Sequence, residues 1–194
     1  MPKEIGIIKL KNVRLSFPAL FEAKAFKDGK PKFSAVLLLD KRKHAADIEA
    51  IEAAIEEVIE EKWPKGINRK VMKPSCLHDG DEKPDTDGYG DGVMYVSASS
   101  AKRVPVVGTK MEPLTEEDGK PYAGCYVNVS IRLWAQDNEY GKRINAQLRA
   151  VQFAKDGEPF GEKQADPNKE FTEIDEDDEA PKKGGKKSED SDLL

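Results

Sequence analysis

The chain has 194 residues, 36% of them charged, with 37 acidic and 32 basic side chains and a formal net charge of −5 at pH 7. Its two cysteines, Cys76 and Cys125, are too few for a disulfide framework and favour a reducing compartment. No apolar run reaches the roughly 18 residues of a membrane-spanning helix, and the first residues do not resemble a secretion signal. We therefore expect no membrane association and a cytoplasmic location, in the host cell if the chain is viral.

The charge is unevenly distributed along the chain. Residues 162–194 hold 12 acidic and 6 basic residues, whereas residues 1–161 hold 25 acidic and 26 basic residues. The composition predicts a folded domain over 1–161 and a disordered acidic tail over 162–194. Such a tail can compete with an anionic ligand or recruit partner proteins. The expected partner-binding residues are Asp190, Asp192, Leu193 and Leu194.

The first predicted elements are two strands. Residues 5–15 alternate imperfectly, which indicates a strand with a bulge near Asn12, and Ser16-Phe17-Pro18 is expected to end it. A lysine-rich loop with a turn at Asp28-Gly29 follows. Residues 33–39 are apolar on both faces, which is typical of a central strand.

A long helix is predicted next. Its apolar stripe has the spacing of one helix face and consists of Ile48, Ile51, Ile55, Val58 and Ile59. The opposite face carries six glutamates, and Trp63-Pro64 should end the helix. Because an anionic face repels phosphate, any surface that binds nucleic acid should lie elsewhere.

The second half of the chain reads as loops and strands. Residues 66–92 and 108–124 are expected to be loops, with a strand at 93–98 and a short strand at 104–107. Residues 125–135 alternate strictly between apolar and polar side chains, and residues 143–150 repeat the alternation after a turn at 137–141. The two runs predict a β-hairpin whose apolar side, including Ala150, is buried.

The outer face of this hairpin suggests a function. It carries Tyr126, Asn128, Ser130, Arg132, Trp134, Arg143, Asn145, Gln147 and Arg149, without a carboxylate. Arginines neutralise phosphates and aromatic rings stack on bases, so this composition favours single-stranded nucleic acid. The alternative is that the face packs against a second layer or the other subunit of a homodimer.

The chain also resembles a known family of bacteriophage single-stranded DNA-binding proteins, related to the replication proteins of short-tailed phages. The resemblance lies in residues 12–22, 78–83, 97–106, 122–128, 131–141, 151–153 and 156–157. It implies an α+β, mostly β fold, an OB-like antiparallel barrel with one long helix, which coats single-stranded DNA without sequence preference during phage replication or recombination. The partners expected for the acidic tail are phage or host replication and recombination proteins. The usual OB order places three strands before its helix, whereas only two are predicted here.

Further candidate DNA contacts lie in loops and at strand ends. In OB-folds the first and the fourth-to-fifth strand loops flank the binding face. The basic candidates are Arg14, Lys30, Lys32, Lys102 and Arg103. Phe17 and Phe21 lie at the end of the first predicted strand, and core positions are expected for them in preference to stacking positions.

An enzymatic function is not predicted. The loop at 78–91 is dense in aspartate around His78, which raises a metal-dependent nuclease as an alternative, but the spacing fits neither a calcium loop nor a zinc site. Aspartates are also favoured in such loops for turn formation alone. We expect no cofactor, no metal and no catalytic residues. The remaining alternative is an acidic-tailed interaction module without a DNA role.

Overall fold

The computed structural model describes residues 4–161 and 167–172. Contacts divide the chain into two units, Met1–Gly161 and Glu162–Leu194. The second unit contains the short helix α2 (Pro167–Glu170). The expected partner-binding residues Asp190, Asp192, Leu193 and Leu194 lie outside the described residues.

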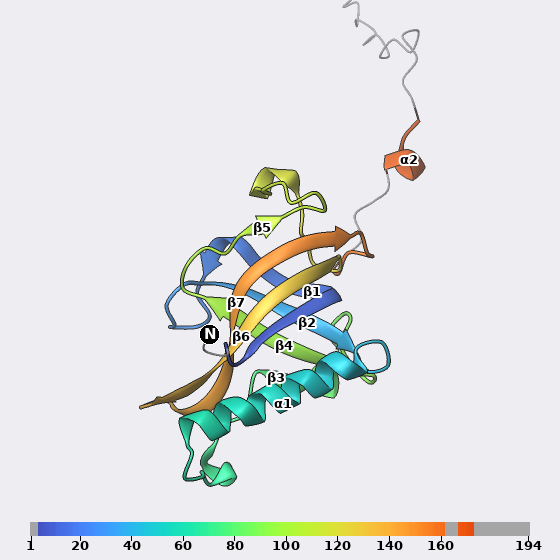
Figure 1. The fold of residues 1–194 in the computed structure, drawn as a ribbon. Helices are drawn as coiled ribbons and strands as arrows, with labels where there is room; N and C mark the ends of the chain where they lie inside the picture. Colours follow the sequence, from blue (N-terminus) through green and yellow to red (C-terminus); the bar gives the residue numbers. More distant parts are fainter. Residues whose placement is uncertain (1–3, 162–166, 173–194) are drawn as a thin grey trace, which may run out of the picture. The chain divides into compact units, whose positions relative to one another are not determined.

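The first unit is a closed five-stranded barrel (Figure 1). Its strands are β1 (Ile7–Lys24), β2 (Lys32–Asp40), β4 (Val93–Ser100), β6 (Tyr126–Asn138) and β7 (Gly141–Lys155). Neighbouring barrel strands pair antiparallel, except that β4 and β7 pair in parallel and so close the barrel. Two short strands extend it: β3 (Leu77–Asp79) pairs with β4, and β5 (Val106–Val107) with β7. The predicted OB-like, mostly β barrel is confirmed.

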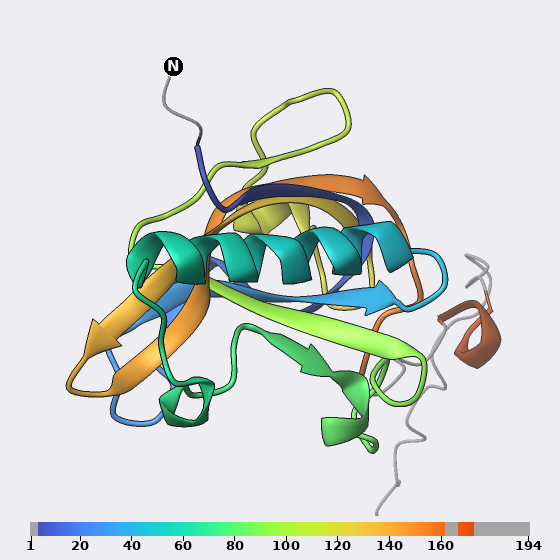
Figure 2. The ribbon, with the colours of Figure 1, turned by 60° about the horizontal axis from the view of Figure 1, so that its bottom comes forward.

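Helix α1 (Ala45–Lys62) follows the second barrel strand. The prediction of two strands before the helix is therefore correct, and the barrel departs from the usual OB order in where its helix is inserted. Figure 2 shows α1 lying along the barrel, which it contacts through β1, β6 and β7. Ile51, Val58 and Ile59 are its buried residues, and Trp63 caps its end, as the sequence predicts.

Strand β1 differs from the prediction because irregularities in its pairing bend it without ending it. The bulge near Asn12 is confirmed by a φ of 52° and a register shift between Leu10 and Val13. A second irregularity, with Phe17 at φ 43°, carries the strand past Pro18 to Lys24. Proline lacks an N–H and is tolerated at bulges, so the expectation that Pro18 stops the strand was wrong.

The predicted loops contain additional elements. Residues 66–92 include β3 and two single turns of 3₁₀ helix, Arg69–Val71 and Gly80–Glu82, and a third 3₁₀ turn, Glu116–Asp118, lies within 108–124. Only Val106 and Val107 of the short strand expected at 104–107 are in a ladder. The two short strands pair with residues distant in sequence, so local composition gave no signal for them.

The β6–β7 hairpin is confirmed, with one correction. Its strands are longer than predicted and meet at Asn138 and Gly141. Ser130 pairs with Ala150 and Ile131 with Leu148, so Arg149 is an extra residue in the ladder. This bulge turns Ala150 away from the core and leaves it half-buried, while Val151 becomes buried.

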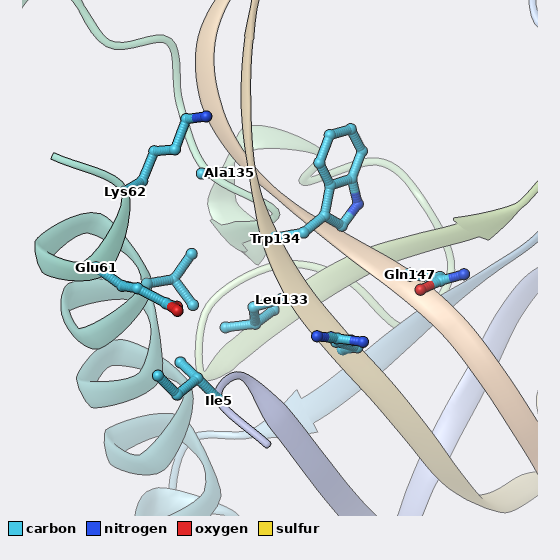
Figure 3. A pocket seen from close by; sticks show the side chains of 9 residues that line it. Ile5, Glu61, Lys62, Leu133, Trp134, Ala135 and Gln147 are labelled. Atoms are coloured by element: carbon cyan, nitrogen blue, oxygen red, sulfur yellow. The ribbon is translucent and has the colours of Figure 1, made fainter. Parts of the chain in front are cut away.

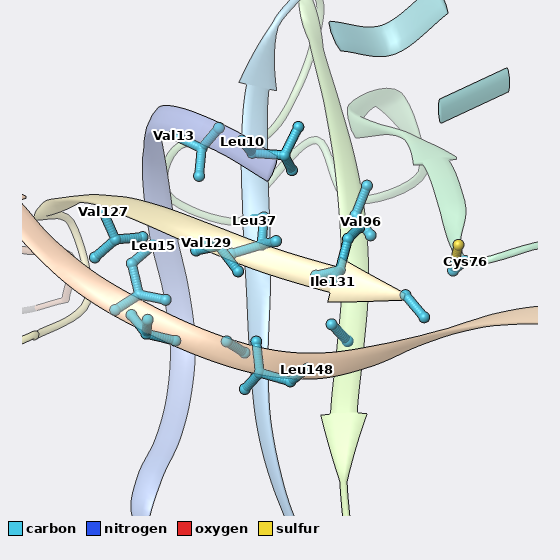
Figure 4. Packing of buried hydrophobic residues seen from close by; sticks show 14 of the residues in the cluster. Leu10, Val13, Leu15, Leu37, Cys76, Val96, Val127, Val129, Ile131 and Leu148 are labelled. Carbon is cyan, nitrogen blue, oxygen red and sulfur yellow. The ribbon is translucent and has the colours of Figure 1, made fainter. Parts of the chain in front are cut away.

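The inward-facing side chains fill the barrel (Figure 4). The fully buried ones include Leu10, Leu15, Leu37, Val96, Val127, Ile131 and Leu148. Because side chains alternate along a strand, burying these residues directs their neighbours outward. The core therefore fixes which residues the barrel presents to a ligand.

Candidate functional site

The polar side chains of the hairpin gather on the outer side of β6 and β7. We call this surface the hairpin face and define it by Tyr126, Asn128, Ser130, Arg132, Trp134, Arg143, Asn145, Gln147 and Arg149. Arg132 lies opposite Gln147 and Trp134 opposite Asn145 in the ladder, so these residues are direct cross-strand neighbours. The predicted grouping on one surface thus follows from the register.

Four members of the hairpin face reach solvent. Arg132, Gln147 and Arg149 are exposed, and the Trp134 side chain is 44% exposed. Neither Arg132 nor Arg149 forms a salt bridge with any residue that the structure describes. Two guanidinium groups and an indole are therefore available to a ligand.

A groove runs between this face and the last turns of α1 (Figure 3). Ile5, Val58 and Leu133 give it an apolar floor, and Arg132, Trp134 and Gln147 line its barrel side. Glu61 and Lys62 line the helix side, so a carboxylate of the acidic helix borders the groove although none belongs to the hairpin face. The groove is thus apolar at its floor and mainly cationic at its rim.

Three of the other residues of the hairpin face, Tyr126, Asn128 and Asn145, are held by intramolecular contacts. Asn128 accepts from the Asn12 N–H and donates to Gln152, both at 3.0 Å, and Asn145 donates to Gln136 at 2.8 Å. The Tyr126 ring lies below the Lys155 ammonium, 4.7 Å from Nζ to the ring centroid. The Arg143 Nε is buried and has no acceptor among the described residues. These side chains stiffen the face, and the exposed four are better placed to bind.

Arg14 is on the outer side of β1, as expected, but its donors are already engaged. Its Nε donates to the Gly124 carbonyl at 3.1 Å and its Nη2 to the Glu158 carbonyl at 2.8 Å. The guanidinium also stacks over Phe160, 4.2 Å from the ring centroid. The structure therefore uses Arg14 mainly to hold the segment that follows β7.

The remaining basic candidates are exposed and scattered. Lys30 lies in the β1–β2 loop and Lys32 opens β2. Lys102 and Arg103 follow β4, where Arg103 donates to the Phe21 carbonyl at 2.7 Å. They do not join the hairpin face.

The aspartate-rich segment around His78 is organised by turns and pairs. Asp79 accepts from the Asp81 N–H and binds Lys41 at 3.0 Å, and these two interactions hold the pKa of its carboxyl below the usual range. The His78 ring stacks on Tyr95 with centroids 4.9 Å apart. Within residues 4–161 and 167–172, no three His, Cys, Asp or Glu side chains are placed to hold a metal ion. No helix described is long and apolar enough to cross a membrane.

The expectation that Phe17 occupies a core position is wrong. Its side chain is 59% exposed, whereas Phe21 packs against the core. The sequence signal that could have shown this is the resumption of apolar residues after Pro18, which implies a continuing, bulged strand. Lys83 and Tyr89, which neighbour Phe17 in space, were not singled out by the sequence at all.

Comparisons with known proteins agree with this architecture. The family model described as Enterobacter phage Enc34, ssDNA-binding protein, matches residues 7–181. Protein p50 of Acyrthosiphon pisum secondary endosymbiont phage 1 is 44% identical over 161 residues, which cover 79% of this chain and 85% of the relative.

Two solved structures are also similar. The bacteriophage Enc34 single-stranded DNA-binding protein in complex with ssDNA has 36% identity and a TM-score of 0.72, over 80% of this chain and 90% of that one. The single-stranded DNA-binding protein gp2.5 of bacteriophage T7 shares 15% identity and a TM-score of 0.54, over 90% and 97% of the two chains, and supports the fold alone.

Proposed function

This chain belongs to the family of the Enterobacter phage Enc34 ssDNA-binding protein, and from that premise we propose that it binds single-stranded DNA through the hairpin face. It coats and protects the strand, without sequence preference, during phage DNA replication or recombination. The proposed contact residues are those of the hairpin face, with Arg14, Lys30, Lys32, Lys102 and Arg103 at its borders.

One observation supports the site most strongly: the exposed Trp134 indole stands beside the Arg132 guanidinium, which forms no salt bridge with a described residue, on a face without carboxylates. A base can stack on the indole, and the guanidinium neutralises the adjacent phosphate. Stacking is tolerant of sequence because every base has a π-face. A sheet surface that binds in this way needs no catalytic group.

The proposal predicts steep salt dependence of binding to a fluorescent oligothymidylate. About four phosphate contacts give a slope near −3 in log K against log salt, so affinity falls about 50-fold between roughly 50 and 200 mM salt. Fluorescence anisotropy titrations at a series of salt concentrations measure this slope. No retention of the oligonucleotide at low salt, by the full chain or by residues 1–161, would favour the interaction module without a DNA role.

The acidic tail is proposed to compete with DNA and to recruit replication or recombination proteins of phage or host. Residues 162–194 carry a net charge of −6, and an anionic segment tethered to a cationic face lowers its affinity for phosphate.

Deleting 162–194 is therefore expected to tighten oligonucleotide binding several-fold at low salt and little at high salt, where charge is screened. Titrations at about 20 and 300 mM salt check this. As a control, Leu193→Ser with Leu194→Ser keeps the charge and should leave DNA affinity unchanged while impairing partner recruitment. Equal DNA affinity of the full and shortened chains at low salt argues against competition.

A further inference from the structure

A second group of aromatic side chains comes from β1, β3, β4 and the loop that precedes β4, with Tyr95 buried and Phe17 exposed. We call it the aromatic cluster and define it by Phe17, His78, Tyr89 and Tyr95. The ring centroids of Phe17 and Tyr89 are 6.3 Å apart, those of Tyr89 and Tyr95 5.1 Å, and those of His78 and Tyr95 4.9 Å. Lys83 places its Nζ 5.2–5.9 Å from the ring centroids of Phe17, Tyr89 and Tyr95.

Phe17 is the exposed member of the cluster. Its left-handed backbone, φ 43°, is unfavourable for a bulky residue and costs about 1–3 kcal/mol, yet it leaves the ring 59% exposed. Burial therefore does not explain the strain. Such strained positions occur preferentially where a side chain is presented to a ligand.

The cluster is also rigid. The Tyr89 hydroxyl donates to the buried Ser16 hydroxyl at 3.1 Å, which fixes the 80–92 loop to β1. The Tyr95 hydroxyl donates to Glu82 at 3.2 Å, and Glu82 is one of several carboxylates in the 79–91 segment that also carries Lys83 and Tyr89. A preorganised ring loses little freedom when a base stacks on it.

The sheet register connects the cluster with the hairpin face. Tyr95, Ser97 and Ser99 follow one another on the outer side of β4, Ser99 pairs with Gln147 of β7, and Gln147 pairs with Arg132 of β6. The connecting positions carry only serine and glutamine, which are uncharged. A DNA strand can therefore pass close to them without electrostatic repulsion. The route crosses two spacings between neighbouring strands, from β6 to β7 and from β7 to β4, and then follows four residues along β4. Its length is therefore roughly 20–25 Å.

We propose that bound single-stranded DNA continues from the hairpin face across Ser99 and Ser97 to the aromatic cluster. There a base stacks on the exposed face of Phe17, and Lys83 contacts the neighbouring phosphate. This inference rests on the proposed function and adds a second contact site to it. It implies that one barrel covers several nucleotides and that a short oligonucleotide reaches only one of the two sites.

The test compares oligothymidylates of about 4 and about 12 nucleotides, both within the range of site sizes for one OB-fold. The parent should bind the longer one more tightly. Phe17→Leu keeps an apolar side chain but removes the ring. It should lower the affinity for the longer oligonucleotide about tenfold and change the affinity for the shorter one little. Phe17→Trp should retain the length effect, and Lys83→Gln should lower the salt slope for the longer oligonucleotide by about 1.

Matched controls come from the far end of β5. Met111→Leu and Lys110→Gln change an exposed apolar residue and an exposed lysine outside the route, and both should bind as the parent does. Parent-like binding of the longer oligonucleotide by Phe17→Leu and Lys83→Gln overturns the inference while leaving the proposed function intact. An equal loss for both lengths with Phe17→Leu also overturns it, because it indicates a structural role in β1. If the parent binds neither oligonucleotide, the proposed function itself fails.

Discussion

Replacing Trp134 and Arg149 together by alanine is expected to weaken binding of an oligothymidylate of about 12 nucleotides about 50-fold or more. Loss of one stacked base costs about 1–3 kcal/mol of binding free energy, and loss of one phosphate contact adds to this cost. Each step of about 1.4 kcal/mol corresponds to a tenfold change in affinity. Both side chains are exposed, so neither change should disturb the fold. Anisotropy at low salt, with a urea titration of each variant, measures binding and stability together.

The matched control replaces Val71 and Arg42 by alanine. It also removes one exposed apolar side chain and one arginine, neither of which belongs to the hairpin face, and should weaken binding by less than threefold. A double variant at Trp134 and Arg149 that folds and binds like the parent would defeat the assignment of this face. If that variant instead converts a dimer to a monomer, as light scattering would show, the face is a subunit contact.

The sequence predicts best those elements that bury one face. In β6 the alternation from Cys125 to Leu133 is matched by burial at every odd position, and the stripe of α1 is matched by Ile51, Val58 and Ile59. In both elements the repeat of apolar side chains along the sequence shows directly which side faces the core. The hairpin face could therefore be derived without coordinates.

The sequence predicts poorly where pairing depends on distant residues. Strand β3 exists because Leu77–Asp79 reaches the edge of β4, and β1 continues past Pro18 because β2 remains its partner. For β3 nothing local distinguishes the segment from loop, whereas the apolar residues after Pro18 are a local signal of a continuing strand. The aromatic cluster was not predicted because Phe17 and Tyr89 are 72 positions apart in the sequence and are brought together by the fold, where their ring centroids lie 6.3 Å apart and the Tyr89 hydroxyl donates to Ser16.

The adjacent residues Ile131 and Arg132 should give opposite results when each is replaced by alanine. Ile131 is fully buried in the barrel, so Ile131→Ala should lower the free energy of unfolding by about 2–5 kcal/mol through lost burial and the cavity left behind. Arg132 is exposed, so Arg132→Ala should change that free energy by less than about 0.5 kcal/mol. Urea denaturation followed by circular dichroism measures both.

The two variants should rank in the opposite order when their affinity for DNA is measured. Under conditions where both are folded, Arg132→Ala should bind the oligonucleotide about tenfold more weakly and with a salt slope reduced by about 1, because one phosphate contact is lost. Ile131→Ala should keep the parent's slope, because it removes no charge. Equal effects of both changes on stability, or a parent-like salt slope for Arg132→Ala, would contradict this. Since the two residues are adjacent on β6 but face opposite sides of it, the comparison separates the surface that holds the barrel together from the one proposed to meet DNA.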